Sequence, residues 1–221
     1  MTQLKDIVKP TIPAQLETLA DLDLAFSTDT IDGALITDDF ISTEQLIDSS
    51  ISESSIVKTS LAYADVSKLD ITDCEFKACD FTASKFPESS WLRVSIAATR
   101  CTGLQLFEST LRNITFVDSK LDLVNFRKTK LENVVFQNCT LTDVDFNGGN
   151  LKNVTFINCI LHDVTFNDAK MVTVDISEST IEHIQGISSL RGVTISESQL
   201  MMLAPSLALA AGLKVRESDA R

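Results

Sequence analysis

The chain has 221 residues, of which 44% are apolar, a share that excludes an intrinsically disordered protein and is enough for a sizeable core. Its 31 acidic and 19 basic residues give a net charge of −12, which excludes binding to nucleic acid or to an anionic membrane through a broadly basic surface. The 7 glycines and 4 prolines are too few for a many-stranded sandwich built on ordinary Gly and Pro turns.

Location and redox state are predicted from the same inventory. No segment approaches the roughly 18 consecutive apolar residues that span a membrane. The opening MTQLKDIVKP has no apolar signal-peptide region, so we expect a cytoplasmic protein. The cysteines are odd in number and include no CxxC pair, which favours reduced, buried thiols over a disulfide framework or a zinc site. They are Cys74, Cys79, Cys101, Cys139 and Cys159.

Residues 1–45 are predicted to form an N-terminal cap. Pro13 followed by AQLETLADL is typical of a short helix with proline in its first turn. The repeat described below extends back to Ile31, but Asp39 and Glu44 would then occupy inward positions, and burying unpaired carboxylates is unfavourable. We therefore expect an irregular first coil, with regular packing from about Leu46.

A strict five-residue period runs from Ile31 to Ile181. All 31 residues met in steps of five are apolar, and they include nine of the twelve phenylalanines. Strands repeat every 2 residues and helices every 3.6, so neither explains a period of five. The position two residues earlier carries no charge from Ser49 onward and is mostly small or β-branched. Two positions in five are therefore predicted to face inward, in a repeat domain over residues 46–185.

The five-residue units resemble those of the pentapeptide repeat family, whose consensus is A(D/N)LXX with a central Leu or Phe. Examples are CEFKA (74–78), VNFRK (124–128), VDFNG (144–148) and CILHD (159–163). The resemblance implies an all-β fold, a right-handed quadrilateral β-helix with one pentapeptide per side and four per coil. Short helical caps are expected at both ends, because a solenoid end exposes apolar core and unpaired backbone.

Four pentapeptides per coil predict a second period, of 20 residues. Side chains 20 residues apart would then stack, with two phenylalanine columns on opposite sides and leucine columns between them. The columns are Phe116, Phe136 and Phe156, and Phe126, Phe146 and Phe166. Asn113, Asn133 and Asn153 would form an amide ladder of the kind that supports stacked strands. Cys139 and Cys159 would be neighbours in the core.

Residues 186–221 are predicted to form a helical cap and a dimerisation segment. Ser196 and Gln199 have the spacing of a capping box, and Pro205 is expected to end that helix and open a second one, which Gly212 ends. The tail holds more apolar side chains than one end of a four-sided rod can cover, and such a surplus predicts an interface. The predicted homodimer interface comprises Leu200, Met201, Leu203, Leu207 and Leu209. Gyrase-interacting members of the family resemble this arrangement, with dimers joined through C-terminal helices.

No catalytic, cofactor-binding or metal-binding residues are predicted. The sequence contains no GxSxG, no phosphate-binding Gly-rich loop and no HExxH motif. His162 and His183 are expected on the outer surface about one coil apart, with Asp163 and Glu182 beside them. A solvated pair is favoured over a metal site, because nothing holds these side chains in a pocket.

The sequence favours a non-catalytic protein-interaction module or scaffold whose protein partner is unidentified. The alternative implied by the resemblance is an acidic DNA mimic that modulates the type II topoisomerases DNA gyrase and topoisomerase IV. Against it, residues 1–60 hold 11 acidic and 3 basic residues, so acidity gathers at one end, and Arg127, Lys128 and Lys130 interrupt the other half. An enzyme or metal-binding protein is a third reading, and neither direct nucleic-acid binding nor membrane binding is expected.

Overall fold

Each five-residue unit forms one side of a four-sided coil. The computed structural model describes residues 7–19, 30–38, 46–47 and 49–214. The strands in this part of the chain range from 2 to 13 residues, and the longer ones extend over more than one five-residue unit. They are β1 (Glu17–Leu19), β2 (Thr30–Asp32), β3 (Ala34–Thr37), β4 (Leu46–Ile47), β5 (Ser50–Ser52), β6 (Ser55–Val57), β7 (Val66–Ser67), β8 (Asp70–Lys77), β9 (Ser90–Ala97), β10 (Thr110–Val117), β11 (Lys120–Asp122), β12 (Lys130–Gln137), β13 (Thr140–Thr142), β14 (Asn150–His162), β15 (Val164–Thr165), β16 (Lys170–Ile181), β17 (Ile184–Gln185) and β18 (Val193–Thr194).

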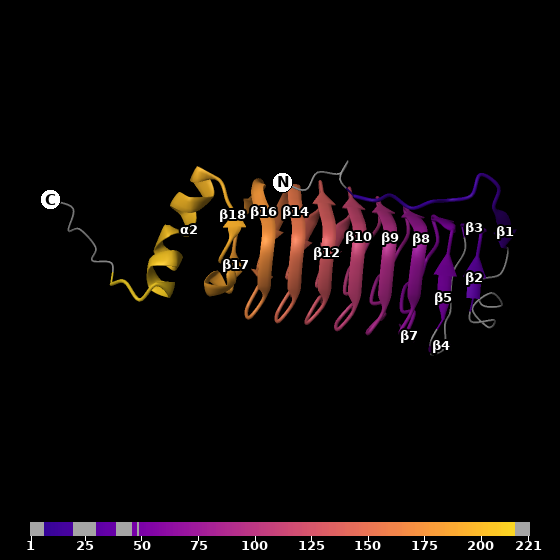
Figure 1. Cartoon of the computed structure of the whole chain (residues 1–221), viewed down its shortest axis with the longest axis horizontal. Helices are drawn as coiled ribbons and strands as arrows, with labels where there is room; N and C mark the ends of the chain where they lie inside the picture. The colour runs from indigo at the N-terminus through magenta and orange to yellow at the C-terminus, as the bar shows by residue number, and fades with distance from the viewer. Residues whose placement is uncertain (1–6, 20–29, 39–45, 48, 215–221) are drawn as a thin grey trace.

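The strands pair in parallel with a register of 20 residues. Leu111 pairs with Leu131, and Leu131 with Leu151, through the ladders of β10, β12 and β14. This register confirms four pentapeptides per coil, in a right-handed parallel β-solenoid of about eight turns (Figure 1). We name its four sides by their central residues. Face A holds Trp91, Leu111 and Leu131; face B holds Ile96, Phe116 and Phe136; face C holds Cys101, Leu121 and Leu141; face D holds Leu106, Phe126 and Phe146.

The central residues of the units form one continuous core. Every central residue from Ile31 to Ile181 whose burial is described is buried, except Met171, which packs against the core while partly exposed. The phenylalanine columns are confirmed. Phe136 stacks on Phe116 and Phe156 at ring-centroid distances of 4.9 and 4.8 Å, and Phe146 stacks on Phe126 and Phe166 at 5.0 and 5.2 Å. These separations match the spacing of hydrogen-bonded strands, so the coil repeat places the rings in stacking contact.

The second inward position, two residues before the central residue, holds small and hydroxylated side chains that form hydrogen bonds with the backbone. The Ser109 hydroxyl accepts a hydrogen bond from the Ser89 amide at 3.0 Å and donates to the Phe86 carbonyl at 3.2 Å. The Ser89 hydroxyl accepts from the Leu69 amide in the same way. Buried hydroxyls are stable here because backbone groups of the preceding coil are their partners.

The chain turns each corner at one left-handed residue, two positions after the central residue. From Glu53 to Thr173 every such residue has a positive φ, including residues with side chains as large as Tyr63 and Leu123. The predicted amide ladder lies at one corner column, where Asn133 donates to Asn113 at 3.3 Å and Asn153 donates to Asn133 at 3.0 Å. Asparagine is suited to this place because it tolerates the left-handed conformation better than most residues.

The N-terminal region differs from the expectation. Residues 13–19 form no helix; Glu17–Leu19 is strand β1, paired with β3. The rest of the expected helix lies outside the described residues, as do Asp39 and Glu44. The 20-residue register begins at Thr30 instead of Leu46, because Ile31 and Ile36 are buried on Ile51 and Ile56 of the next coil. Long-range pairing thus overrides the local helical pattern.

The C-terminal cap is a single helix. After the short 3-10 helix η2 (Ile187–Ser189) and strand β18, helix α2 runs from Glu197 to Ala210 and contains Pro205. The expected break at Pro205 is therefore wrong: Leu203 and Leu207, on either side of the proline, both pack on the solenoid and hold the helix together. The capping box at its start is confirmed, with the Ser196 hydroxyl accepting from the Gln199 amide.

Candidate functional site

The inner side of α2 closes the last coil of the solenoid. The Gln199 side chain is 6% exposed, and its Nε2 donates to the Ile176 carbonyl at 2.8 Å and to the Ser179 carbonyl at 2.6 Å. Its Oε1 accepts from the Ser196 amide at 2.9 Å. Gln199 therefore completes the helix cap and satisfies edge carbonyls of the last coil with one fully hydrogen-bonded amide.

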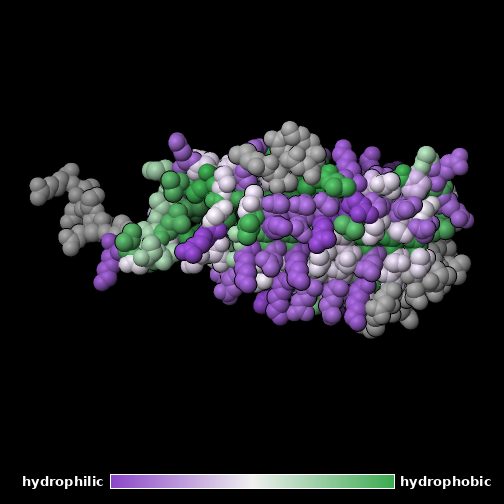
Figure 2. Space-filling view, in the orientation of Figure 1, coloured by the Kyte–Doolittle hydropathy of each residue, from purple (hydrophilic) through white to green (hydrophobic). Residues whose placement is uncertain are grey.

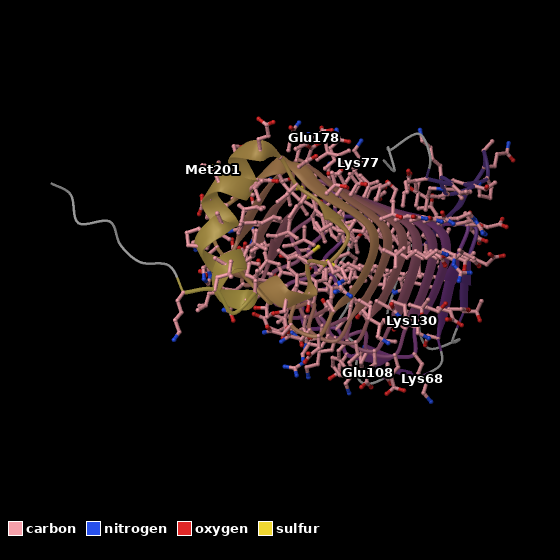
Figure 3. The ribbon with its side chains drawn as sticks, turned by 60° about the vertical axis from the view of Figure 1, so that its left-hand side comes forward. Lys68, Lys77, Glu108, Lys130, Glu178 and Met201 are labelled. Carbon is pink, nitrogen blue, oxygen red and sulfur yellow. The ribbon has the colours of Figure 1, made fainter. Side chains whose placement is uncertain are left out.

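The outer side of α2 is apolar and open to solvent. Met201 and Leu209 are 76% and 77% exposed, and Leu200 is 48% exposed. Figure 2 shows hydrophobic side chains gathered over α2, and Figure 3 shows Met201 on the side of the helix that faces away from the solenoid. Patches of this kind are uncommon on monomeric proteins and mark interaction surfaces.

Two of the five predicted interface residues belong to the cap instead. Leu203 is 6% exposed and lies in the core, and Leu207 packs against the core while partly buried. Both lie on the inner side of α2, since one helix face must cover the open coil. Conversely, Met202 and Leu213 are exposed and belong to the outer apolar surface. Neither residue was among those predicted from the sequence. We name Leu200, Met201, Met202, Leu209 and Leu213 the end patch.

Charged side chains on the solenoid surface pair between neighbouring coils. Glu132 lies between Arg112 and Lys152, at 3.0 and 2.7 Å. Lys85 and Asp65 are 2.9 Å apart, and Lys128 and Glu108 are 2.8 Å apart. Each pair joins residues 20 apart in the sequence, so basic and acidic groups alternate along the rod on this part of the surface.

The two histidines lie on the surface of the last coils and alternate with two carboxylates. His183 Nδ1 lies 2.5 Å from Asp163 Oδ1, and His162 Nε2 lies 3.1 Å from Asp163 Oδ2. His162 Nδ1 is 2.7 Å from Glu182 Oε2, in a contact that lacks hydrogen-bond geometry. All four side chains are at least 39% exposed. Among the described residues, no group of three or more His, Cys, Asp or Glu side chains is arranged to hold a metal ion.

The five cysteines are buried and free. Burial raises the pKa of the Cys74 thiol to about 12 and raises that of Cys101 further. Cys139 and Cys159 lie in neighbouring coils and are each 1% exposed, as expected, and the contact with Cys159 together with burial raises the pKa of Cys139. These thiols therefore act as small core side chains.

An N-terminal strap, defined as residues 7–16, lies along the solenoid. Figure 1 shows it in indigo, running from β1 past β8 and β9 toward β10. Ile7 is 5% exposed, and a groove of about 320 Å³ lies between the strap and residues of β8, β9 and β10. Burial of the Ile7 side chain contributes about 1.5–3 kcal/mol to holding the strap in place.

One hydrogen bond joins the described strap to the solenoid. The Thr11 amide donates to Asp73 Oδ1 at 2.9 Å, and the Arg93 guanidinium makes two hydrogen bonds to the same carboxylate. The hydrogen bond from Arg93 holds the pKa of Asp73 below its usual range, with a smaller contribution from the Thr11 amide. No residue in this latch stood out in the sequence, because its partners are 62 positions apart.

Comparisons with known proteins were made for the sequence and for the fold. The model of the pentapeptide repeat region matches residues 69–140 and 102–161. No curated protein matches the sequence. No helix in the described part of the chain combines the length and apolarity needed to cross a membrane.

Solved structures of low sequence identity resemble the fold. QnrB1, described as a plasmid-mediated fluoroquinolone resistance protein, is 16% identical over 85% of this chain and 100% of its own, with a TM-score of 0.37. HetL from Nostoc sp. strain PCC 7120, a pentapeptide repeat protein involved in heterocyst differentiation regulation, is 8% identical over 82% of this chain and 98% of its own, with a TM-score of 0.30. Rfr23 from the cyanobacterium Cyanothece 51142 is 9% identical over 64% of this chain and 91% of its own, with a TM-score of 0.24.

The family match and the repeat agree with each other. The matched segments together cover residues 69–161, where the five-residue period, the corners and the 20-residue register are all regular. The chain therefore contains a pentapeptide repeat region, matched by the family model over residues 69–161.

Proposed function

We propose that the protein is a non-catalytic protein-interaction module that self-associates through the end patch on α2. The observation that carries the proposal is the exposure of five large apolar side chains at one end of the rod. The inner side of the same helix already closes the last coil through Gln199 and Leu203. The outer side chains are therefore a surplus that capping does not use.

A two-fold contact is the arrangement that best uses this surplus. The same patch on two copies would pack against itself and close, whereas contact with a different surface would build a fibre. The product is a rod of double length whose first described coils, β1 to β6, lie outermost. In these coils Glu17, Asp32, Asp38 and Glu53 are exposed and acidic and Lys58 is basic, so both outer ends of the dimer would carry a net negative charge.

Light scattering at micromolar concentration tests the dimer. We expect about twice the chain mass of 24.2 kDa for the wild type, and the single-chain mass for a variant with both Met201→Glu and Leu209→Glu. The control is Tyr63→Glu, because Tyr63 is 74% exposed and precedes β7, at the other end of the rod from α2 (Figure 1). Leu203 is unsuitable for this test, since its loss would open the cap. A wild-type chain of single mass would refute self-association.

The second candidate function is modulation of a type II topoisomerase by DNA mimicry. The acidity of residues 1–60 supports it. The alternation of basic and acidic side chains along the solenoid, as at Arg112, Glu132 and Lys152, speaks against a continuous DNA-like stripe. We therefore expect no inhibition of gyrase supercoiling or topoisomerase IV relaxation by the purified dimer. Inhibition at micromolar protein would establish the DNA-mimic function in its place.

A further inference from the structure

The end patch contains two of the chain's four methionines. Met201 and Met202 are neighbours in α2 and are 76% and 45% exposed, and Met201 lies on the side of the helix that faces away from the solenoid (Figure 3). Met171, by contrast, packs against the core. A methionine thioether packs as an apolar group, but a two-electron oxidant such as a peroxide converts it to a polar sulfoxide. The end patch therefore combines apolar contact area with reactive sulfur.

The thiols of the chain are protected from such oxidants. All five cysteines are at most 3% exposed. The thiolate is the form of cysteine that reacts with peroxides. Burial raises the pKa of Cys74 to about 12 and that of Cys101 further, so both remain thiols at neutral pH. A peroxide that meets the folded chain should therefore react with the exposed thioethers of the end patch before it reacts with any thiol.

We propose that Met201 and Met202 are a peroxide-reactive modification site whose oxidation dissociates the dimer. The inference rests on the proposed function, because the same two side chains belong to the contact between the copies. In each reaction the sulfur lone pair attacks one oxygen of hydrogen peroxide and the O–O bond breaks. A sulfur–oxygen bond forms, and the departing hydroxide takes the proton of the transferred oxygen and leaves as water. Sulfur loses two electrons and the peroxide gains them, so no further reactant is needed.

A sulfoxide is incompatible with an apolar contact for two reasons. The oxygen that it adds is a hydrogen-bond acceptor, and burying an unpaired polar atom is unfavourable. The side chain also loses the favourable transfer of an apolar surface out of water. A two-fold contact repeats each loss on both copies. We therefore expect full oxidation of Met201 and Met202 to raise the Kd of the dimer at least about a hundredfold.

Oxidation acts on the separated chain, because the proposed contact covers both methionines in the dimer. A chain that is oxidised while free no longer re-associates, so peroxide shifts the whole population toward the monomer by mass action. Sulfoxide formation at Met201 should therefore slow as the protein concentration rises above Kd. Methionine sulfoxide reductases return the thioether at the expense of a reductant, which makes the modification reversible.

The experiment treats the full chain with hydrogen peroxide and separates dimer from monomer by size-exclusion chromatography. Peptide mass spectrometry should find the gain of about 16 Da per sulfoxide at Met201 and Met202 concentrated in the monomer fraction. Reduction by methionine sulfoxide reductases should restore the dimer. The control is Met171→Leu, a volume-conserving change of the methionine that packs on the core, which should respond to peroxide as the wild type does. A double variant, Met201→Leu with Met202→Leu, should keep its own untreated mass after peroxide.

The outcomes separate failure of the switch from failure of the dimer. Sulfoxides at Met201 and Met202 that are equally abundant in dimer and monomer, dissociation that persists in the double variant, or dissociation that Met171→Leu abolishes would each overturn the proposal. The first and third of these results decide it if the double variant does not dimerise. A wild type that is monomeric before peroxide refutes self-association and the switch together, whereas a dimer that survives oxidation at both methionines refutes the switch alone.

Discussion

The residue that sets the shape of each coil is the left-handed one at its corner. The left-handed conformation is unfavourable by about 1–2 kcal/mol for a residue with a Cβ, and the penalty is smallest for Gly, Asn and Asp. The column of corners between faces C and D contains Gly103, Asp143 and Asp163, which suit it, but also Leu123, with φ 56 and 58% exposure. Leu123 therefore bears the conformational cost without gaining the burial that a leucine normally contributes.

Leu123→Asn should stabilise the protein. We expect the free energy of unfolding to rise by about 0.5–1 kcal/mol, because asparagine lowers the cost of the left-handed backbone and little apolar burial is lost. Urea denaturation measures the change. Leu123→Ala is the control, since it shortens the side chain but keeps the unfavourable conformation. A lower stability for Leu123→Asn than for Leu123→Ala would contradict this account.

Asp73 should make stability depend on pH in the acid range. The hydrogen bond from Arg93 lowers the folded-state pKa of Asp73, so the unfolded chain binds more protons as the pH falls toward 4. The stabilisation is present above the unfolded-state pKa of about 3.9 and is lost as the pH falls through the lower, folded-state pKa.

Asp73→Asn therefore should flatten the acid limb of the stability curve. Thermal unfolding between pH 2 and 7 should show the wild type losing more stability below pH 4 than the variant. The exposed Asp118 provides a control, because in the described part of the chain its carboxylate forms no salt bridge with a basic side chain, and Asp118→Asn should keep the wild-type slope. Parallel curves for the wild type and Asp73→Asn would show that the latch carboxylate is not the source of the effect.

At the scale of elements, α2 depends on tertiary contact more than on its own sequence. Pro205 removes one backbone hydrogen bond from the helix interior, yet the helix continues to Ala210. Leu203 and Leu207 hold it on the last coil, and Gln199 joins it to two carbonyls of that coil. The cap is therefore a docked element whose contacts decide whether it forms.

Gln199→Glu tests that dependence with almost no change in volume. The two N–H donors to the Ile176 and Ser179 carbonyls are lost, and a carboxylate oxygen would face them instead. We expect a loss of about 2–3 kcal/mol in the free energy of unfolding and faster amide exchange throughout α2. Glu197→Gln, a change at the exposed start of the same helix, should have little effect. A stable, protected helix in Gln199→Glu would show that the apolar contacts suffice.

Over the whole molecule, stability is distributed along stacked columns. Each coil contacts mainly its two neighbours, so the rod behaves as a linear array whose weakest point is set by local packing. Phe136 lies in the middle of one column, 0% exposed, with Phe116 and Phe156 stacked on either side.

Phe136→Ala should cost about 3–5 kcal/mol, because the neighbouring coils are held in register by their ladders and cannot collapse into the cavity. Phe136→Leu, which keeps most of the volume, should lose much less. Urea denaturation compares the two variants. A loss below about 1 kcal/mol for the alanine variant would show that the core relaxes around the cavity.

The repeat determined most of the architecture in advance. Apolar residues in steps of five, from Ile31 to Ile181, imply the four-sided coil and its 20-residue columns, because spacing within a coil is a local property of the chain. The capping box at Ser196 was predictable for the same reason. The left-handed corners were also present in the sequence, as the Asn, Asp and Gly residues two positions after many central residues.

The tertiary structure decided what sequence neighbours cannot. It made Glu17–Leu19 a strand by pairing it with β3, where the local pattern favours a helix. It carried α2 through Pro205 and turned Leu203 inward, because an open coil end needs an apolar cover. It also brought Thr11 to Asp73 across 62 positions. The sequence by itself thus determines the coil, whose contacts are local and periodic, while the ends and the strap depend on contacts between residues far apart in the chain.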